Sequence, residues 1–280
     1  MMKTISRILQ LWRVYAYLDL MWVTRDLKNV LIFYISDIIL SVASATGTLL
    51  LAERFEGIGF WTKFQVVFML GYAITVWGLM VTFFNYNVAI ISRRLGRGQL
   101  DHTLLQPQPL WMALLTEGFT PFSGLAVLVS GLGLIVWATI KLSIAVSFGW
   151  LAMLALNLVA SLTVLLSFLY LWGSLAFWAP RAAEEISSSG ERLMDQLTPF
   201  PLDRLSPFLL GGMMTVFPVG FVAWYPCRYL LGLDQRAWSG WVTPLAAVVF
   251  AGLTTFFFLK GLEHYGRTGS QRYLGFGHRR

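Results

Sequence analysis

Long apolar runs constrain the fold of this chain more than any other feature of its sequence. Each run is long enough to cross a bilayer as a helix, which takes about 20 residues. The runs predict six spans: 30–51, 64–91, 113–140, one long helix within 142–180, a kinked span starting near residue 205, and 242–259. Hydrophobic residues make up 57% of the chain and charged residues only 12%, too few to cover a water-soluble protein of 280 residues. We therefore predict an all-α, polytopic membrane protein with six transmembrane helices and a single domain over residues 1–280.

The segment 3–28 predicts an amphipathic helix before the first span. Apolar side chains recur on one face at helical spacing, and Lys3, Arg7 and Arg13 share the other face. A basic helix with Trp12 on its apolar side suits the bilayer surface. The same pattern is also compatible with the cytoplasmic start of the first span.

The distribution of Lys and Arg predicts the orientation of the spans. With the N-terminus in the cytoplasm, 16 of the 21 Lys and Arg residues fall on inside segments and 5 on outside segments. Inside loops of membrane proteins carry this excess of positive charge. The inside group includes the polar segment 181–204 with Arg181, Arg192 and Arg204. Both termini, including the tail 262–280, are therefore expected in the cytoplasm.

The stretch 217–233 is apolar yet interrupted by Pro218, Gly220 and Pro226. Backbone that breaks at membrane depth must be covered by protein or line a cavity. The stretch predicts a short re-entrant hairpin on the outer side, before the last helix, with an ordinary surface loop as the alternative.

The sequence shows little catalytic chemistry. His102, His264 and His278 form no zinc-peptidase pattern, and one cysteine, Cys227, provides neither an intrachain disulfide framework nor a multi-cysteine metal site. No Gly-rich phosphate-binding loop is present, so no cofactor is expected in this chain. The positive charge is explained by topology, and no nucleic-acid partner is expected.

Asp37 is the single carboxylate well inside a predicted span. An intramembrane ionisable group suggests a functional polar site by default. The alternative is a carboxylate near an interface or hydrogen-bonded within the bundle. Because no basic partner is evident inside the spans, the second interpretation is favoured and Asp37 is expected to serve folding.

A polar island, 91–110, separates the second and third apolar runs. It mixes basic residues with leucines and is too short to be a domain. It is predicted to form a cytoplasmic loop or short helix that docks a soluble partner, the alternative being an ordinary basic loop at the headgroups. The candidate docking residues are Arg94, Gly98, Leu100, Asp101, Leu104, Leu105 and Pro107.

Three stretches of the chain resemble one known family, the six-span permeases of exporter-type (ABC-2 class) ATP-binding-cassette transporters. Gly98-Gln99-Leu100-Asp101 followed by Leu104-Leu105-Gln106-Pro107 resembles that family's Gly-Glu-Leu-Asp…Leu-Leu-Arg-Pro motif. The stretch 218–232, with Trp224-Tyr225-Pro226, resembles the family's segment before the last span. Gly261-Leu262-Glu263-His264-Tyr265 to Gly269-Ser270 resembles its C-terminal end. The order and spacing of the three stretches cover nearly the whole chain.

This resemblance implies an export permease in the bacterial plasma (inner) membrane that moves a small drug-like or toxic compound. Two separate ATPase subunits would bind ATP and magnesium, and a second permease, identical or homologous, would complete the assembly. The island would form the coupling helix, with Asp101 as its N-terminal cap and Pro107 as its stop. Gln99 and Gln106 depart from the family pattern and imply an altered polar contact with the ATPase.

Two other classes of function remain open from the residues alone. One is a membrane-embedded enzyme that modifies lipid, and the other is a channel or structural membrane protein unrelated to ATP-binding-cassette transporters. Co-purification with an ATPase separates the permease from both alternatives.

Overall fold

The computed structural model describes residues 2–54, 60–89, 91–234 and 236–269, and this part of the chain is helical without a strand. The all-α prediction is thereby confirmed. The elements in chain order are α1 (Met2–Arg25), α2 (Leu27–Arg54), α3 (Lys63–Ala89), α4 (Ile91–Gly96), α5 (Gln99–Leu104), α6 (Leu110–Thr116), α7 (Leu125–Lys141), α8 (Phe148–Gly173), the 3-10 turn η1 (Ser174–Phe177), α9 (Pro180–Leu197), α10 (Pro207–Thr215), the π-helical turn η2 (Gly220–Trp224), α11 (Tyr225–Leu230), η3 (Ala237–Trp241) and α12 (Val242–Thr268).

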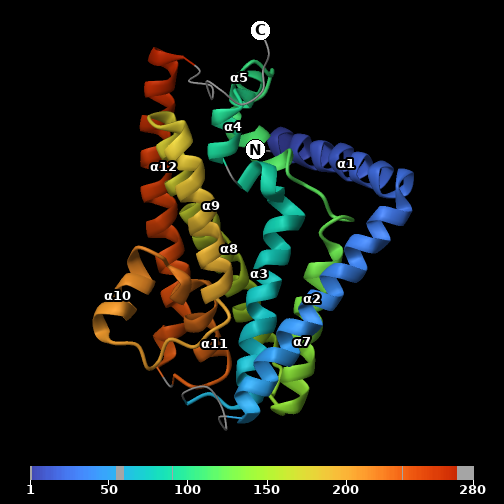
Figure 1. Cartoon of the computed structure of the whole chain (residues 1–280), viewed down its shortest axis with the longest axis vertical. Coiled ribbons are helices and arrows are strands. Elements are labelled where there is room, and N and C mark those ends of the chain that lie inside the picture. The colour runs from blue at the N-terminus through green and yellow to red at the C-terminus, as the bar shows by residue number, and fades with distance from the viewer. Residues whose placement is uncertain (1, 55–59, 90, 235, 270–280) are drawn as a thin grey trace.

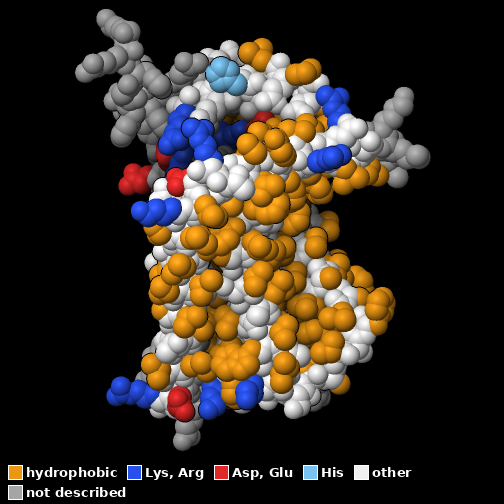
Figure 2. Space-filling model, turned by 90° about the vertical axis from the view of Figure 1, so that its right-hand side faces the viewer, with side chains coloured by type: hydrophobic (Ala, Val, Ile, Leu, Met, Phe, Trp, Pro, Cys, Tyr) orange, Lys and Arg blue, Asp and Glu red, His pale blue; other side chains and the backbone are white. Residues whose placement is uncertain are grey.

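The long helices run along the long axis of the molecule, while α1 lies across one end beside α4 and α5 (Figure 1). We call this end, which carries the segment 91–110, the island end, and the opposite end, which carries Trp61, the far end. Hydrophobic side chains cover the middle of the face in Figure 2, and Lys and Arg side chains gather toward its two ends. This distribution is typical of a protein that spans a bilayer.

Four helical stretches are long and apolar enough to cross a membrane: Leu27–Gly47, Lys63–Asn85, Phe148–Phe177 and Trp238–Thr268. A fifth candidate combines α10 with the stretch Gly220–Leu230, which are bent by 82° relative to each other and therefore form either a broken span or a re-entrant loop. α7 is apolar but only 17 residues long. Length and composition thus support four or five spans, and the sixth predicted span stays a prediction.

The predicted third span, 113–140, is not one helix. α6 ends at Thr116 and α7 begins at Leu125. Gly118 lies so close to α3 that a Cβ there would approach the Phe84 carbonyl oxygen to 2.2 Å, and the Thr120 backbone N–H donates to the Thr82 carbonyl at 2.8 Å. The break therefore allows close backbone contact with α3 that a continuous helix would lose.

The single long helix predicted within 142–180 is confirmed, but it starts later than the apolar run. Residues 142–147 form the turn between α7 and α8. The Ser147 hydroxyl accepts a hydrogen bond from the Trp150 backbone N–H at 3.1 Å and so caps α8.

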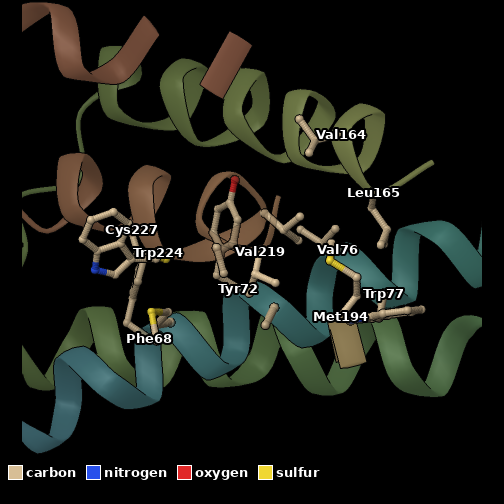
Figure 3. Packing of buried hydrophobic residues seen from close by; sticks show 14 of the residues in the cluster. Phe68, Tyr72, Val76, Trp77, Val164, Leu165, Met194, Val219, Trp224 and Cys227 are labelled. Atoms are coloured by element: carbon tan, nitrogen blue, oxygen red, sulfur yellow. The ribbon is translucent and has the colours of Figure 1, made fainter. Parts of the chain in front are cut away.

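α3 forms the centre of the bundle. Most of its side chains are buried, and it contributes more residues to the main core than any other helix; in Figure 3 Tyr72 and Val76 of α3 lie among residues of the later helices. The Tyr72 and Ser161 hydroxyls are hydrogen-bonded at 3.0 Å and connect α3 to α8. An apolar helix buried on all sides is expected at the centre of a membrane bundle.

The polar segment 181–204 does not remain at the island end, contrary to the prediction from charge. At its start, the Arg93 Nε lies 3.5 Å from a Glu184 carboxylate oxygen. At its end, the Trp61 indole N–H donates to the Asp203 carboxylate at 2.5 Å. Arg204, predicted on the inside, lies at the far end with its guanidinium carbon 5.3 Å from the centre of the Phe60 ring. The chain therefore runs from end to end through α9, which packs along α8 (Figure 1).

Candidate functional site

The polar island folds into two short helices, α4 and α5, joined at Gly98. Gly98 has φ 68°, a left-handed conformation that glycine adopts without strain and that turns the chain between the helices. α5 ends at Leu104, three residues before Pro107, so the predicted short helix is present. The Pro107 carbonyl accepts a hydrogen bond from the Arg7 guanidinium of α1 at 3.3 Å.

Asp101 has a different structural role from the predicted one. The residue at the N-cap of α5 is Gly98, and no side chain caps this helix. Asp101 lies inside α5, and its carboxylate accepts a hydrogen bond from the Tyr265 hydroxyl of α12. The Asp101 side chain therefore joins the island to the last long helix instead of starting α5.

The three leucines of the predicted docking surface separate into two groups. Leu100 is fully buried in a small core at the island end, which we call the end core: Ile91, Leu95, Leu100, Ala176, Phe177, Ala183 and Tyr265. Leu104 and Leu105 are 44% and 83% exposed. Leu100, one of the candidate docking residues, is therefore covered by the chain's own end core, while its predicted role in docking stays a prediction. The exposed surface around Leu104 and Leu105 includes Arg97, Gln99, His102, Pro107 and Trp111.

Arg94 faces inward and forms an ion pair with Glu117. Both side chains are largely buried, and the Gln106 amide donates a second hydrogen bond to the Glu117 carboxylate at 3.0 Å. Gln106, expected to affect a contact with a partner, thus contacts its own chain. Burial raises the pKa of the Tyr15 hydroxyl, and the Glu117 carboxylate adds to the rise while Arg94 opposes it. The amphipathic helix α1 is thereby close to the same ion pair.

A second polar region lies between the long helices, away from the island. A cavity of about 330 Å³ is lined by side chains of α2, α3, α7 and α9. Asp37, Ser41 and Ser44 follow one another at helical spacing on α2. The other lining residues are Leu40, Ile74, Trp77, Val81, Val127, Glu191, Arg192 and Asp195. We call this space the α2–α9 cavity.

Asp37 therefore shares a cavity with charged residues of α9, a segment that the sequence analysis placed in the cytoplasm. Glu191, Arg192 and Asp195 belong to α9, which was predicted to lie outside the membrane because of these same charges. The signal that could have indicated the contact is the strong amphipathicity of α9, whose apolar side includes the buried Met194. Asp37 is not the isolated carboxylate that the sequence suggested.

Comparison with known protein families identifies the chain. A family described as ABC-2 family transporter protein matches residues 30–269. The chain belongs to this family. The permease therefore is a membrane transport subunit and not itself an ATP-hydrolysing enzyme, and the family is one that associates with ABC ATPase components. The match includes both the island and the α2–α9 cavity. No curated protein and no solved structure matches the permease.

Proposed function

We propose that the permease is the membrane-spanning part of an ABC exporter that carries a small, drug-like or toxic compound across a bacterial plasma membrane. ATP would be hydrolysed by two separate ATPase subunits, which bind ATP and magnesium. The observation that carries this proposal is the pair of exposed leucines, Leu104 and Leu105, on a short helix at one end of a bundle of apolar helices. Leucines exposed at a charged end of a membrane protein are more stable when a soluble partner covers them than when they face water.

The island is well placed to transmit movement of the ATPase into the bundle. Leu104 and Leu105, at the end of α5, are exposed, whereas Leu100 of α5 is buried in the end core that also contains Phe177, and Asp101 accepts a hydrogen bond from Tyr265. A push on α5 would therefore reach α12 through the Asp101–Tyr265 hydrogen bond and through the end core. Arg94 adds a second connection, because its ion pair with Glu117 joins α4 to the break before α7.

The proposed arrangement in the membrane places the island end and both termini in the cytoplasm. α1 lies on the inner surface of the bilayer, α10 to α11 re-enter from the outer side, and α9 is the fifth of six passes. Arg192 and Asp195 of α9 are exposed in the single chain. A charge facing lipid at the bilayer centre costs about 2.5–3.5 kcal/mol. A second permease that encloses this side in a polar cavity removes that cost.

Labelling of introduced cysteines tests the position of α9. A cysteine at Leu205 is expected to react in intact cells with a membrane-impermeant maleimide, and a cysteine at Leu105 is expected to react only after the cells are opened. Cys227 is buried and serves as the unreactive background. If the Leu205 site is protected in intact cells, the segment 181–204 lies in the cytoplasm, as its charges predicted, and the proposed position of α9 is wrong.

Substitution at the island tests the docking proposal. Leu105→Asp and Leu104→Asp should each weaken ATPase binding by about 30-fold, because a charge replaces an apolar contact worth about 2 kcal/mol. The permease should still insert and remain folded. Leu205→Asp makes the same change on an exposed leucine at the far end and should leave ATPase binding unchanged. Normal ATPase assembly and export in the two island variants would reduce the island to a basic surface loop.

A further inference from the structure

A groove lies between α2 and α7, in the half of the molecule nearer the far end. Both helices lie on the right-hand side of Figure 1, and this side faces the viewer in Figure 2. The groove has a volume of about 340 Å³, within the range of small-molecule sites. We call it the α2–α7 groove. Its walls include Val42, Ala45 and Leu49 of α2 and Gly133, Leu134 and Trp137 of α7.

The interior of the groove is apolar. None of the described residues that line it is charged, and the Ser130 hydroxyl among them donates to the Ala126 carbonyl of its own helix at 2.8 Å. Gly133 leaves the wall of α7 open, because a Cβ at this position would meet no atom within 4 Å. The lining of an empty apolar hollow loses dispersion contacts on one side. The groove is therefore more stable with an apolar occupant than without one.

Basic side chains lie at the far-end mouth of the groove. Lys141 follows Trp137 by four residues and lies in the last turn of α7. The Trp137 and Phe64 rings pack edge to face with 5.9 Å between their centroids, and the Lys63 Nζ lies 5.5 Å from the centre of the Phe64 ring. Both lysines are exposed. The Glu53 carboxylate, 3.9 Å from the Lys63 Nζ, balances one of these two charges. The mouth therefore keeps an excess of positive charge.

An apolar interior with a basic mouth matches the chemistry of an anionic phospholipid. The acyl chain of such a lipid is apolar, and its phosphate lies at the membrane surface, where Trp and Lys side chains of membrane proteins gather. A second copy of the permease matches this face less well. A two-fold interface places the same patch of both copies together, so the lysines at the two mouths would repel each other.

We propose that the α2–α7 groove binds an anionic phospholipid, with one acyl chain between the two helices and the phosphate against Lys63 and Lys141. The acyl chain completes the packing between α2 and α7, the latter being only 17 residues long. In the proposed arrangement of the permease in the membrane, this lipid belongs to the outer leaflet. Binding of the lipid depends neither on the ATPase nor on the compound that is exported.

Quenching of Trp137 fluorescence by brominated lipids tests the proposal. The full-length permease is placed in phosphatidylcholine nanodiscs that contain a varied fraction of phosphatidylglycerol or phosphatidylcholine with brominated acyl chains. The Trp137 signal is the difference between the permease and its Trp137→Phe variant. We expect half-maximal quenching at a roughly fivefold lower fraction of brominated phosphatidylglycerol, the factor expected for one excess basic side chain near the membrane surface.

Either of two results would overturn the proposal. Equal quenching by the two brominated lipids would show that ordinary bilayer lipid fills the groove without selection. Absence of quenching by both would show that protein, such as a second permease, covers it.

Filling the groove tests where the acyl chain lies. Gly133→Leu places a side chain in open space, so it should leave thermal unfolding in lipid-free detergent unchanged and remove the preference for phosphatidylglycerol. Gly252→Leu makes the same change at an equally open position on α12 and should retain the preference. A preference that persists in folded Gly133→Leu permease would place the lipid elsewhere.

Removing a charge at the mouth tests where the phosphate lies. Lys141→Gln should reduce the preference for phosphatidylglycerol to less than about twofold, because it removes the excess positive charge. Lys260→Gln makes the same change on the exposed surface of α12 at the island end and should leave the preference unchanged. Lys141 is exposed, so this variant decides the question even if Gly133→Leu does not fold. An undiminished preference in Lys141→Gln would contradict the assignment of the phosphate.

Discussion

α2 and α3 have nearly the same mean hydropathy, 1.8 and 2.0, but they occupy opposite environments. In the most apolar stretch of α2 only 11% of the residues are buried within the protein, whereas in that of α3 78% are buried. Hydropathy therefore selects both helices for the membrane and does not distinguish the centre of the bundle from its edge. The exposed face of α2 has no covering within the described chain and is available to lipid or to a second permease.

Small residues explain the difference between the two helices. Gly71 and Gly78 of α3 approach α7 so closely that a Cβ at Gly78 would lie 2.7 Å from the Leu128 Cα. Gly131 of α7 is equally close to α3, because a Cβ there would lie 2.5 Å from the Thr75 backbone nitrogen. Gly47 of α2 has nothing within 4 Å of its Cβ position. Membrane helices pack through small residues that let backbones approach, because lipid provides no hydrophobic drive between them.

The largest effect is expected from enlarging one of these glycines. Gly78→Leu should separate α3 from α7 and destabilise the permease by about 3 kcal/mol or more, because its Cβ would contact backbone that cannot move aside. Gly47→Leu on α2 is the matched control and should leave stability unchanged. Thermal unfolding in detergent measures both. Equal melting temperatures would show that the α3–α7 contact is looser than described.

The next effect concerns what covers α2. Ile39 is 60% exposed near the middle of the helix, and Leu50 is 62% exposed near its far end. Ile39→Arg should cost about 2.5 kcal/mol, because an arginine at the helix centre meets an apolar environment, whereas Leu50→Arg can extend its charge to the membrane surface at little cost. We expect Ile39→Arg to dissociate paired permeases while each remains inserted, as scored by cross-linking. Pairing that survives this change would assign the face of α2 to lipid.

The smallest effect is expected within the core. Tyr72→Phe removes the hydrogen bond to Ser161 and should lower the free energy of unfolding by about 1 kcal/mol. The matched change Tyr17→Phe on the exposed side of α1 should lower it by less than a few tenths. Comparable losses at the two tyrosines would contradict the central position of α3.

The apolar helices could be predicted from the sequence, whereas the contacts between them could not. α2, α3, α8 and α12 follow directly from apolar runs, because every backbone group of a spanning helix is satisfied within the helix. α9 could not be placed in this way, since its charges resemble those of a cytoplasmic segment, and its position along the bundle depends on its packing against α4 and α8. The break before α7 had local signals in Gly118 and Gly124, but its purpose, close contact with α3, depends on residues far away in the sequence.

At the island, the sequence predicted a short helix but not its orientation. Leu100 and Leu105 are equally apolar, and only Leu100 belongs to the end core, whose other members, such as Phe177 and Tyr265, lie far away in the sequence. The role of Asp101 depends in the same way on a tyrosine more than 160 positions later. Local patterns identify such segments, while their exposed faces are determined by distant partners.

The native mass of the gently extracted assembly tests the central claim most directly. Expressed with its ATPase and extracted in mild detergent, the permease should have the mass of two permeases plus two ATPase subunits, and Leu105→Asp should release the ATPases while the permease pair persists. A permease that carries no ATPase under conditions that preserve its fold would contradict the account.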